Sequence, residues 1–177
     1  MRFLAIALVS ISLLAGSWQF MGRASAQVNS NDNNIAVMDN CDPSDPAWNT
    51  VGGCFLRKGS VSLSEFNNLL FSPLSSTIPV GHPSWRNEPS YISTSARRNI
   101  NVTNWGGRTH TFTHVANFGG GVVPPLNGSL VVAPECVSPG VVPLAPGDTQ
   151  RITNLSPGTH KYMCCIHPWM RAAIEVE

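Results

Sequence analysis

Hydrophobic and polar residues alternate with a period of two in several short stretches of the C-terminal half. This alternation, or enrichment in β-branched and aromatic residues, marks residues 99–102, 111–113, 149–155, 159–164 and 171–177. In the last stretch Ala172, Ile174 and Val176 face one way while Glu175 and Glu177 face the other, which predicts a half-buried final strand. Short strands separated by turn residues, with no alternation of strands and helices, predict an all-β protein built as a β-sandwich.

One stretch has a helical rather than a strand pattern. Ser62 and Glu65 form an S-x-x-E capping box, and the apolar residues that follow share one helical face: Phe66, Leu69, Leu70 and Phe71. This predicts one short helix, whose apolar face packs on the domain.

Three segments show no sustained period. Residues 27–59 are rich in Asn, Asp, Ser, Pro and Gly, and prolines between residues 72 and 94 oppose long regular structure. Residues 117–148 form a long connection rich in Gly and Pro. A connection of that length without its own structure is usually functional or disordered.

The N-terminus has the features of a signal peptide. Arg2 precedes an apolar run at 3–14, and the small-x-small pattern of residues 24–26 indicates cleavage before Gln27. The apolar run is shorter than the roughly 20 residues that span a bilayer, so a retained anchor is the less favoured alternative. We therefore expect three parts: a signal peptide at 1–26, an irregular N-terminal extension with the short helix at 27–75, and one β domain at 76–177.

The net charge argues against two classes of partner. Cleavage removes Arg2 and Arg23, which leaves 11 − 2 = 9 basic residues against 10 acidic ones and a mature net charge near −1 with neutral histidines. Nucleic-acid binding and polybasic membrane attachment are therefore not expected. We expect an exported protein, periplasmic or secreted and monomeric, with no membrane span after signal cleavage.

The C-terminal segment concentrates metal-binding chemistry. Cys164, His167 and Met170 are spaced as Cys-x2-His-x2-Met. A thiolate, imidazoles and a weak thioether are the mixed set that suits copper, but the pattern needs a second histidine. We expect Pro168 to stiffen the loop that follows Cys164, so that two ligands resist rearrangement.

The second histidine must come from elsewhere in the chain. His110, at the start of a predicted strand after the Gly106-Gly107 turn, is the preferred candidate. His114 competes, because residues 110 and 114 lie on one face of a strand, yet about 13 Å of strand separates them and both should not bind one ion. His160 is expected to pack or hydrogen-bond under the site, and His82 to be structural.

Five cysteines in an exported chain cannot all pair in disulfides. The metal site would use the cysteine that remains. Cys165 should point away from a metal bound by its neighbour, and we expect it to form a disulfide, with Cys136 as the candidate partner. A local disulfide is expected between Cys41 and Cys54. Four cysteines allow three connectivities, and sequence does not distinguish them.

Two segments resemble the ligand segments of the cupredoxins, the plastocyanin-like type 1 blue copper proteins: residues 104–113 and residues 158–170. The resemblance covers roughly residues 90–177. It implies a Greek-key β-sandwich, one copper ion cycling between Cu(I) and Cu(II), and the ligands His110, Cys164, His167 and Met170. Two departures are His160, where the family usually has an aromatic residue, and Cys165 beside the ligand thiol.

The function that the resemblance implies is one-electron transfer between transient redox protein partners, with His167 as the exit if its ring edge reaches the surface. Pro168, Trp169 and residues 122–124 are candidates for an apolar docking patch. Copper carriage or buffering with the same ligands is the alternative. An enzyme is disfavoured, because the chain has only five histidines and no His-x-His pair for a second copper centre.

Overall fold

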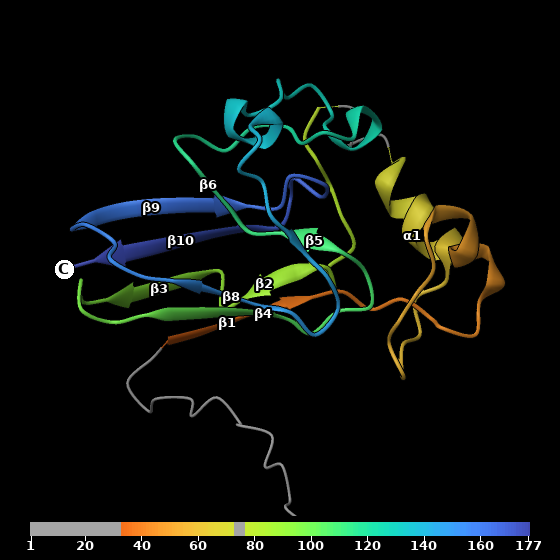
Figure 1. The fold of residues 1–177 in the computed structure, drawn as a ribbon. Helices are drawn as coiled ribbons and strands as arrows, with labels where there is room; N and C mark the ends of the chain where they lie inside the picture. The colour runs from red at the N-terminus through yellow and green to blue at the C-terminus, as the bar shows by residue number, and fades with distance from the viewer. Residues whose placement is uncertain (1–32, 73–76) are drawn as a thin grey trace, which may run out of the picture.

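Two four-stranded sheets form the body of the protein (Figure 1). The structure is a computed structural model, and it describes residues 33–72 and 77–177. The expected signal peptide, residues 1–26, lies outside the described residues. The first sheet has the order β2-β1-β4-β8 and consists of β1 (Asn33–Met38), β2 (Arg86–Glu88), β4 (Ile100–Asn104) and β8 (Thr149–Ile152). The second has the order β3-β10-β9-β6 and consists of β3 (Tyr91–Thr94), β6 (Thr113–Val115), β9 (Gly158–Met163) and β10 (Arg171–Val176).

The core lies between these sheets, and it confirms the all-β prediction. Ile35 and Val102 of the first sheet and Ile174 of the second are almost fully buried in one hydrophobic cluster. The final strand has the predicted alternation, with Ala172, Ile174 and Val176 buried. Most strand pairs are antiparallel, but β1 runs parallel to β4 and β3 runs parallel to β10. Within the described part of the chain, none of the helices combines the length and apolarity needed to cross a bilayer.

β1 is a strand that the sequence analysis does not identify. It lies inside the expected irregular extension, and it pairs with both β2 and β4. Its apolar residues Ile35 and Val37 alternate with Asn34 and Ala36 and are buried to 1% and 0% exposure. The surrounding polar residues hide this short alternation. β1 is important for the site because it ends at Met38, immediately before Asp39.

The rest of the N-terminal extension covers one end of the sheets, opposite the C-terminus (Figure 1). It contains the 3₁₀ helix η1 (Pro46–Val51) and the helix α1 (Leu63–Leu70). The predicted capping interaction is present, because the Ser62 hydroxyl accepts a hydrogen bond from Glu65 N at 3.1 Å. Cys41 and Cys54 form the local disulfide. The aromatic rings of Trp48 and Phe66, which belong to this layer, pack against each other and against Trp85.

The long connection between β6 and β8 has structure of its own, so the expectation of a structureless segment is wrong. It contains η3 (Pro124–Leu126), η4 (Pro134–Val137) and β7 (Pro143–Leu144). Asn127 closes a loop through both of its amide atoms, since Oδ1 accepts from Gly121 N and Nδ2 donates to Gly121 O. A disulfide between Cys136 and Cys165 ties the segment to the end of β9. Short elements of this kind have too few periodic residues to be recognised in the sequence.

The predicted strand at residues 111–113 is divided at Phe112. β5 (His110–Thr111) pairs with β7, whereas β6 pairs with β9 of the second sheet. Phe112 is buried at the change of partner and stacks on Tyr162 with ring centroids 4.7 Å apart. This break directs His110 and His114 to different surroundings.

Candidate metal centre

Three ligand-type atoms meet at the end of the sheets that the N-terminal layer covers. His110 comes from β5, Cys164 directly follows β9, and His167 lies in the loop between β9 and β10. The Cys164 sulfur lies 3.8 Å from His110 Nδ1 and 3.7 Å from His167 Nδ1, and the two nitrogens are 3.1 Å apart. Atoms bound to one ion at about 2.0–2.3 Å lie about 3–4 Å from one another. The separations therefore fit three ligands of one metal ion, and among the described residues these form the group of three or more ligand-type side chains that could hold a metal.

The fourth expected ligand, Met170, is held next to this group by the backbone. Cys164 N donates to Met170 O at 3.0 Å, and Met170 N donates to His167 O at 2.9 Å. Met170 is fully buried in the same hydrophobic cluster as Cys164. Two hydrogen bonds thus close the loop on itself and fix the relative positions of all three residues that it carries.

Cys164 is the described cysteine outside the two disulfides, and its surroundings favour the thiolate. Burial alone would raise the pKa of this thiol, but hydrogen bonds from His110 and His167 and their charges hold it well below its ordinary value. Thr111 N also donates to the sulfur at 3.4 Å. Cys165 N in turn donates to Thr111 Oγ1 at 2.8 Å, so one threonine orients both cysteines. The thiolate is the form of cysteine that binds metals.

A buried carboxylate lies behind His110. Asp39 Oδ2 accepts a hydrogen bond from His110 Nε2 at 2.6 Å, and both side chains are completely inaccessible to solvent. Burial opposes protonation of His110, but the bonds and charges of Asp39 and Cys164 outweigh it and raise the pKa to about 9. With Nε2 committed to Asp39, Nδ1 is the atom directed at Cys164 and His167. Carboxylate partners of this kind orient histidine ligands in many metal sites.

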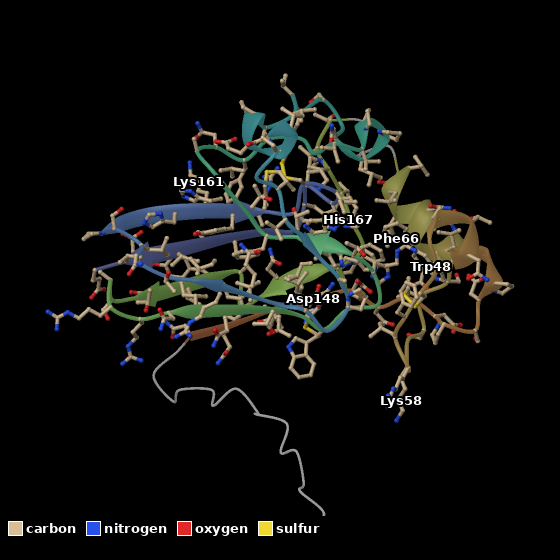
Figure 2. All side chains as sticks on the ribbon, viewed as in Figure 1. Trp48, Lys58, Phe66, Asp148, Lys161 and His167 are labelled. Carbon is tan, nitrogen blue, oxygen red and sulfur yellow. A yellow bond between two sulfur atoms is a disulfide. The ribbon has the colours of Figure 1, made fainter. Side chains whose placement is uncertain are left out.

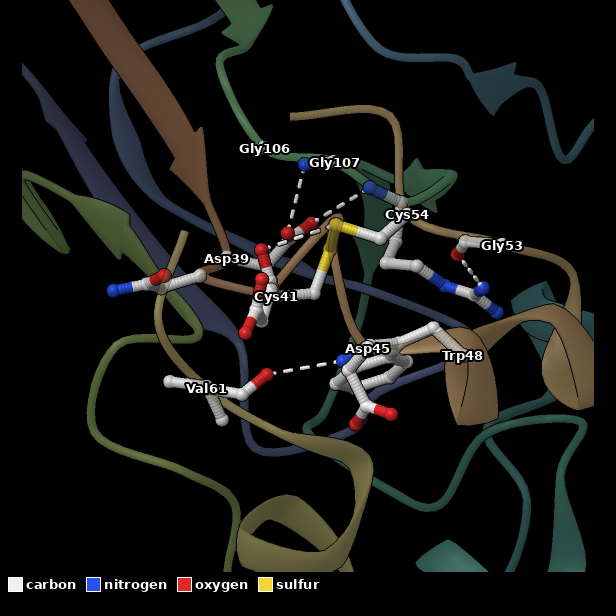
Figure 3. Close-up of a disulfide and its surroundings, with 12 residues drawn as sticks. Asp39, Cys41, Asp45, Trp48, Gly53, Cys54, Val61, Gly106 and Gly107 are labelled. Atoms are coloured by element: carbon white, nitrogen blue, oxygen red, sulfur yellow. Dashed lines mark hydrogen bonds between the residues drawn. A yellow bond between two sulfur atoms is a disulfide. The ribbon is translucent and has the colours of Figure 1, made fainter. Parts of the chain in front are cut away.

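The backbone around the Gly106-Gly107 turn holds Asp39 in place (Figure 3). Gly107 N donates to Asp39 Oδ1 at 2.7 Å, and Arg108 N donates to Oδ2 at 3.0 Å. A Cβ on Gly106 would lie 2.2 Å from Asp39 Oδ2, so the close approach requires glycine there. The Arg108 guanidinium donates to the Val51 and Gly53 carbonyls and lies over the Trp48 ring, which links this turn to the N-terminal layer.

Aromatic rings cover the histidines. The Trp85 ring meets the His167 ring edge-on at 4.9 Å, and Trp169 lies 5.5 Å from it. His167 is consequently only 7% exposed, so its ring edge does not form the expected open exit. Figure 2 shows His167 on the side of the sheets that faces Phe66 and Trp48. Trp169 is half-buried and lies against Gly81, where a Cβ would come within 1.9 Å of the indole.

The remaining histidines lie elsewhere. His82 accepts from Ser84 N and contacts Glu65 at 3.2 Å, which fits the expected structural role. His114 is exposed on β6, and its ring nitrogen Nε2 lies 3.3 Å from His160 Nδ1. His160 is hydrogen-bonded as expected, but it lies four residues before Cys164 on β9 beside His114, and not under the metal group.

Asp39 and Trp85 are contributors to the site that sequence reasoning missed. Asp39 lies 71 residues from His110 in a segment without clear periodicity, and Trp85 follows a Gly-His-Pro turn. The alternation of Ile35 and Val37 could have revealed β1 and so placed Asp39 at a strand end. No sequence signal identifies the partner of that carboxylate.

Comparisons with known proteins give weak similarities. No family model matches the chain, and no curated protein matches it. Among solved structures, a purple cupredoxin from Nitrosopumilus maritimus is 14% identical, with 82% of this chain and 100% of that chain covered and a TM-score of 0.43. Amicyanin from Paracoccus versutus is 18% identical over 57% of this chain and 81% of that chain, with a TM-score of 0.37. At these TM-scores the similarity identifies no family, so the residues of the site carry the interpretation that follows.

Proposed function

We propose that the chain is a type 1 copper protein that transfers single electrons, with His110, Cys164, His167 and Met170 as the ligands of one copper ion. The observation that carries this proposal is the spacing of one buried thiolate and two imidazole nitrogens at 3.1–3.8 Å. Two histidines, one cysteine and a distant methionine form the ligand set of blue copper sites. Bound copper would supply a change of one electron between Cu(I) and Cu(II).

The protein's own contribution is a site that stays nearly constant during that change. Asp39 fixes the His110 ring, the hydrogen-bonded loop fixes His167 and Met170, and the Thr111 amide fixes the Cys164 sulfur. Supporting contacts of this kind hold ligands in productive geometry. A site that cannot rearrange requires little reorganisation when an electron arrives or leaves.

Burial also bears on the choice between electron transfer and copper carriage. His110 and Cys164 are 0% exposed and His167 is 7% exposed, under Trp85 and Trp169. A carrier must release its metal to an acceptor, which needs access to the ligands. The closed arrangement therefore favours retention of the ion and passage of electrons. A catalytic role is not proposed, because the four ligands leave no open position for a substrate.

Electrons would enter and leave through contacts with transient protein partners. His167 is covered, so we propose the face around half-buried Trp169 and exposed Val122 as the docking surface. Val122 N donates to Cys165 O at 2.7 Å, which places this loop beside the ligand segment. The two disulfides fit an oxidising, exported compartment.

Rapid-mixing kinetics test the function directly. The copper-loaded chain should be reduced by a small one-electron donor and reoxidised by a one-electron acceptor over repeated cycles, with one electron per copper and no loss of metal to a chelator. In partner assays, Val122→Ser tests the proposed docking surface. Val142→Ser, which replaces another exposed valine, is its matched control. Slow, incomplete cycling with ready copper release would support carriage and contradict electron transfer.

A further inference from the structure

A second pair of histidines lies outside the proposed copper centre, where β6 and β9 run side by side. His114 Nε2 and His160 Nδ1 are 3.3 Å apart, and their ring centroids are 5.3 Å apart. Each lies four residues along the chain from a proposed copper ligand, which corresponds to about 13 Å of extended chain. The stacked rings of Phe112, between β5 and β6, and of Tyr162 on β9 lie between these positions. The pair is therefore separate from the first group.

The hydrogen bond of His160 to the backbone selects its tautomer. Its Nε2 lies 2.8 Å from the Ser156 carbonyl oxygen, which can only accept, so Nε2 carries the hydrogen. In the neutral ring Nδ1 then presents a lone pair toward His114. A histidine whose second nitrogen is held by a backbone carbonyl is a typical arrangement in metal sites.

The separation of the two nitrogens matches that of two ligands on one ion. Imidazole nitrogens bound at about 2.0–2.1 Å with bond angles near tetrahedral lie about 3.3 Å apart. In the metal-free chain His114 Nε2–H donates to His160 Nδ1. After a change of tautomer at exposed His114, rotation of the two rings would direct both lone pairs at one ion beside the line that joins the nitrogens.

The surroundings favour a cation that remains accessible to solvent. His114 lines an open hollow of about 540 Å³ together with Glu135, Tyr162 and Arg151. Glu135 accepts a hydrogen bond from Ala116 N through Oε1, while its buried Oε2 has no hydrogen-bond partner among the described residues, so a carboxylate lines the same hollow as His114. The positive charge of Arg151, which lines the same hollow, opposes the binding of a cation. Lys161, on the alternate face of β9, donates to Ala116 O and Asn117 Oδ1 instead.

We propose that His114 and His160 form a second, solvent-facing binding site for a divalent late transition metal, with Cu(II) bound most tightly. Imidazole ligands suit copper, nickel and zinc, and the affinity of such sites rises to a maximum at Cu(II). Water would complete the coordination. The proposal does not depend on electron transfer at the first centre.

Metal titration of the full chain tests this site. We expect two Cu(II) ions per chain, and electron paramagnetic resonance of the second should show nitrogen ligation with no thiolate absorption band. His114→Ala and His160→Ala should each lower the affinity for the second ion at least tenfold and leave the affinity for the first ion unchanged. His82→Ala, which removes a histidine with other partners, should leave both ions bound.

Zinc provides a second readout, because it contributes no colour or paramagnetism of its own. With the first centre filled, isothermal titration with Zn(II) should show one further binding event, abolished in His114→Ala and in His160→Ala. Retention of the Cys164-dependent copper band in both variants would establish that they are folded. Second-ion binding that is absent, or that survives both substitutions unchanged, would overturn the proposal.

Discussion

Asp39 places a buried negative charge directly behind His110. A charge at hydrogen-bond distance from a ligand should stabilise the more positive oxidation state, because little solvent is present to screen it. Asp39→Asn keeps a hydrogen-bond acceptor and removes the charge. We expect the reduction potential of the copper centre in this variant to rise by tens of millivolts. For a one-electron change, about 59 mV corresponds to a tenfold change in the relative affinity of the site for Cu(I) and Cu(II). Spectroelectrochemical titration measures this.

The matched control is Asp148→Asn, which changes an exposed carboxylate in the turn before β8 (Figure 2). Its potential should equal that of the unaltered protein. A potential for Asp39→Asn that is equally unchanged would show that the carboxylate does not act on the metal.

The raised pKa of His110 gives a pH dependence. His110 stays protonated below about pH 9, whereas the pKa of His167 and that of Cys164 are lowered. A metal must therefore displace one proton, from His110, and copper affinity should rise about tenfold per pH unit from pH 7 toward 9. Calorimetry at pH 7.5 in buffers of different ionisation enthalpy should detect about one proton released per copper. Release of no proton would contradict the ion pair of Asp39 and His110.

At the scale of elements, the N-terminal layer encloses the metal group through its aromatic residues. Phe66 of α1 is buried and contacts Trp48, Trp85 and Trp169. Phe66→Ala should reduce the free energy of unfolding by about 3–5 kcal/mol, the usual cost of removing a buried ring. It should also speed copper loss to a chelator, since Trp85 and Trp169 lose their support.

Phe71→Ala is the control, because Phe71 directly follows α1 and is 65% exposed. This substitution should change the free energy of unfolding by no more than about 0.5 kcal/mol. Equal copper loss from both variants would mean that the layer does not enclose the site.

The disulfide between Cys136 and Cys165 anchors the long connection next to Cys164. It closes a loop of 29 residues, for which chain entropy corresponds to about 3–4 kcal/mol. The double substitution Cys136→Ser with Cys165→Ser should lower the free energy of unfolding by roughly that amount in chemical denaturation. The thiolate-to-copper band should persist, because Cys164 is the one cysteine among the four proposed ligands. Loss of the band in this folded variant would implicate Cys165 in metal binding.

At the scale of the whole molecule, sequence reasoning identified the elements with clear local patterns. The alternation of β10, the capping box of α1 and the spacing from Cys164 to Met170 are all signals carried by neighbouring residues. The contacts that it missed join distant segments. The bond from Asp39 to His110 depends on the parallel pairing of β1 with β4, and no local pattern encodes such a pairing.

The histidines illustrate the same limit. Strand geometry predicted that His110 and His114 do not bind one ion, and in the structure they have different neighbours. It gave no indication that the chain changes sheets at Phe112, or that His114 meets His160 on a neighbouring strand. Both facts depend on the pairing of β5 with β7 and of β6 with β9, which join segments distant in the sequence.

Visible absorption and electron paramagnetic resonance of residues 27–177, titrated with Cu(II), test the central claim most directly. We predict an intense thiolate-to-copper band with narrow copper hyperfine splitting, abolished by Cys164→Ala and by His110→Ala and retained in His114→Ala. A weak or colourless copper signal that Cys164→Ala leaves unchanged would contradict the proposed copper centre.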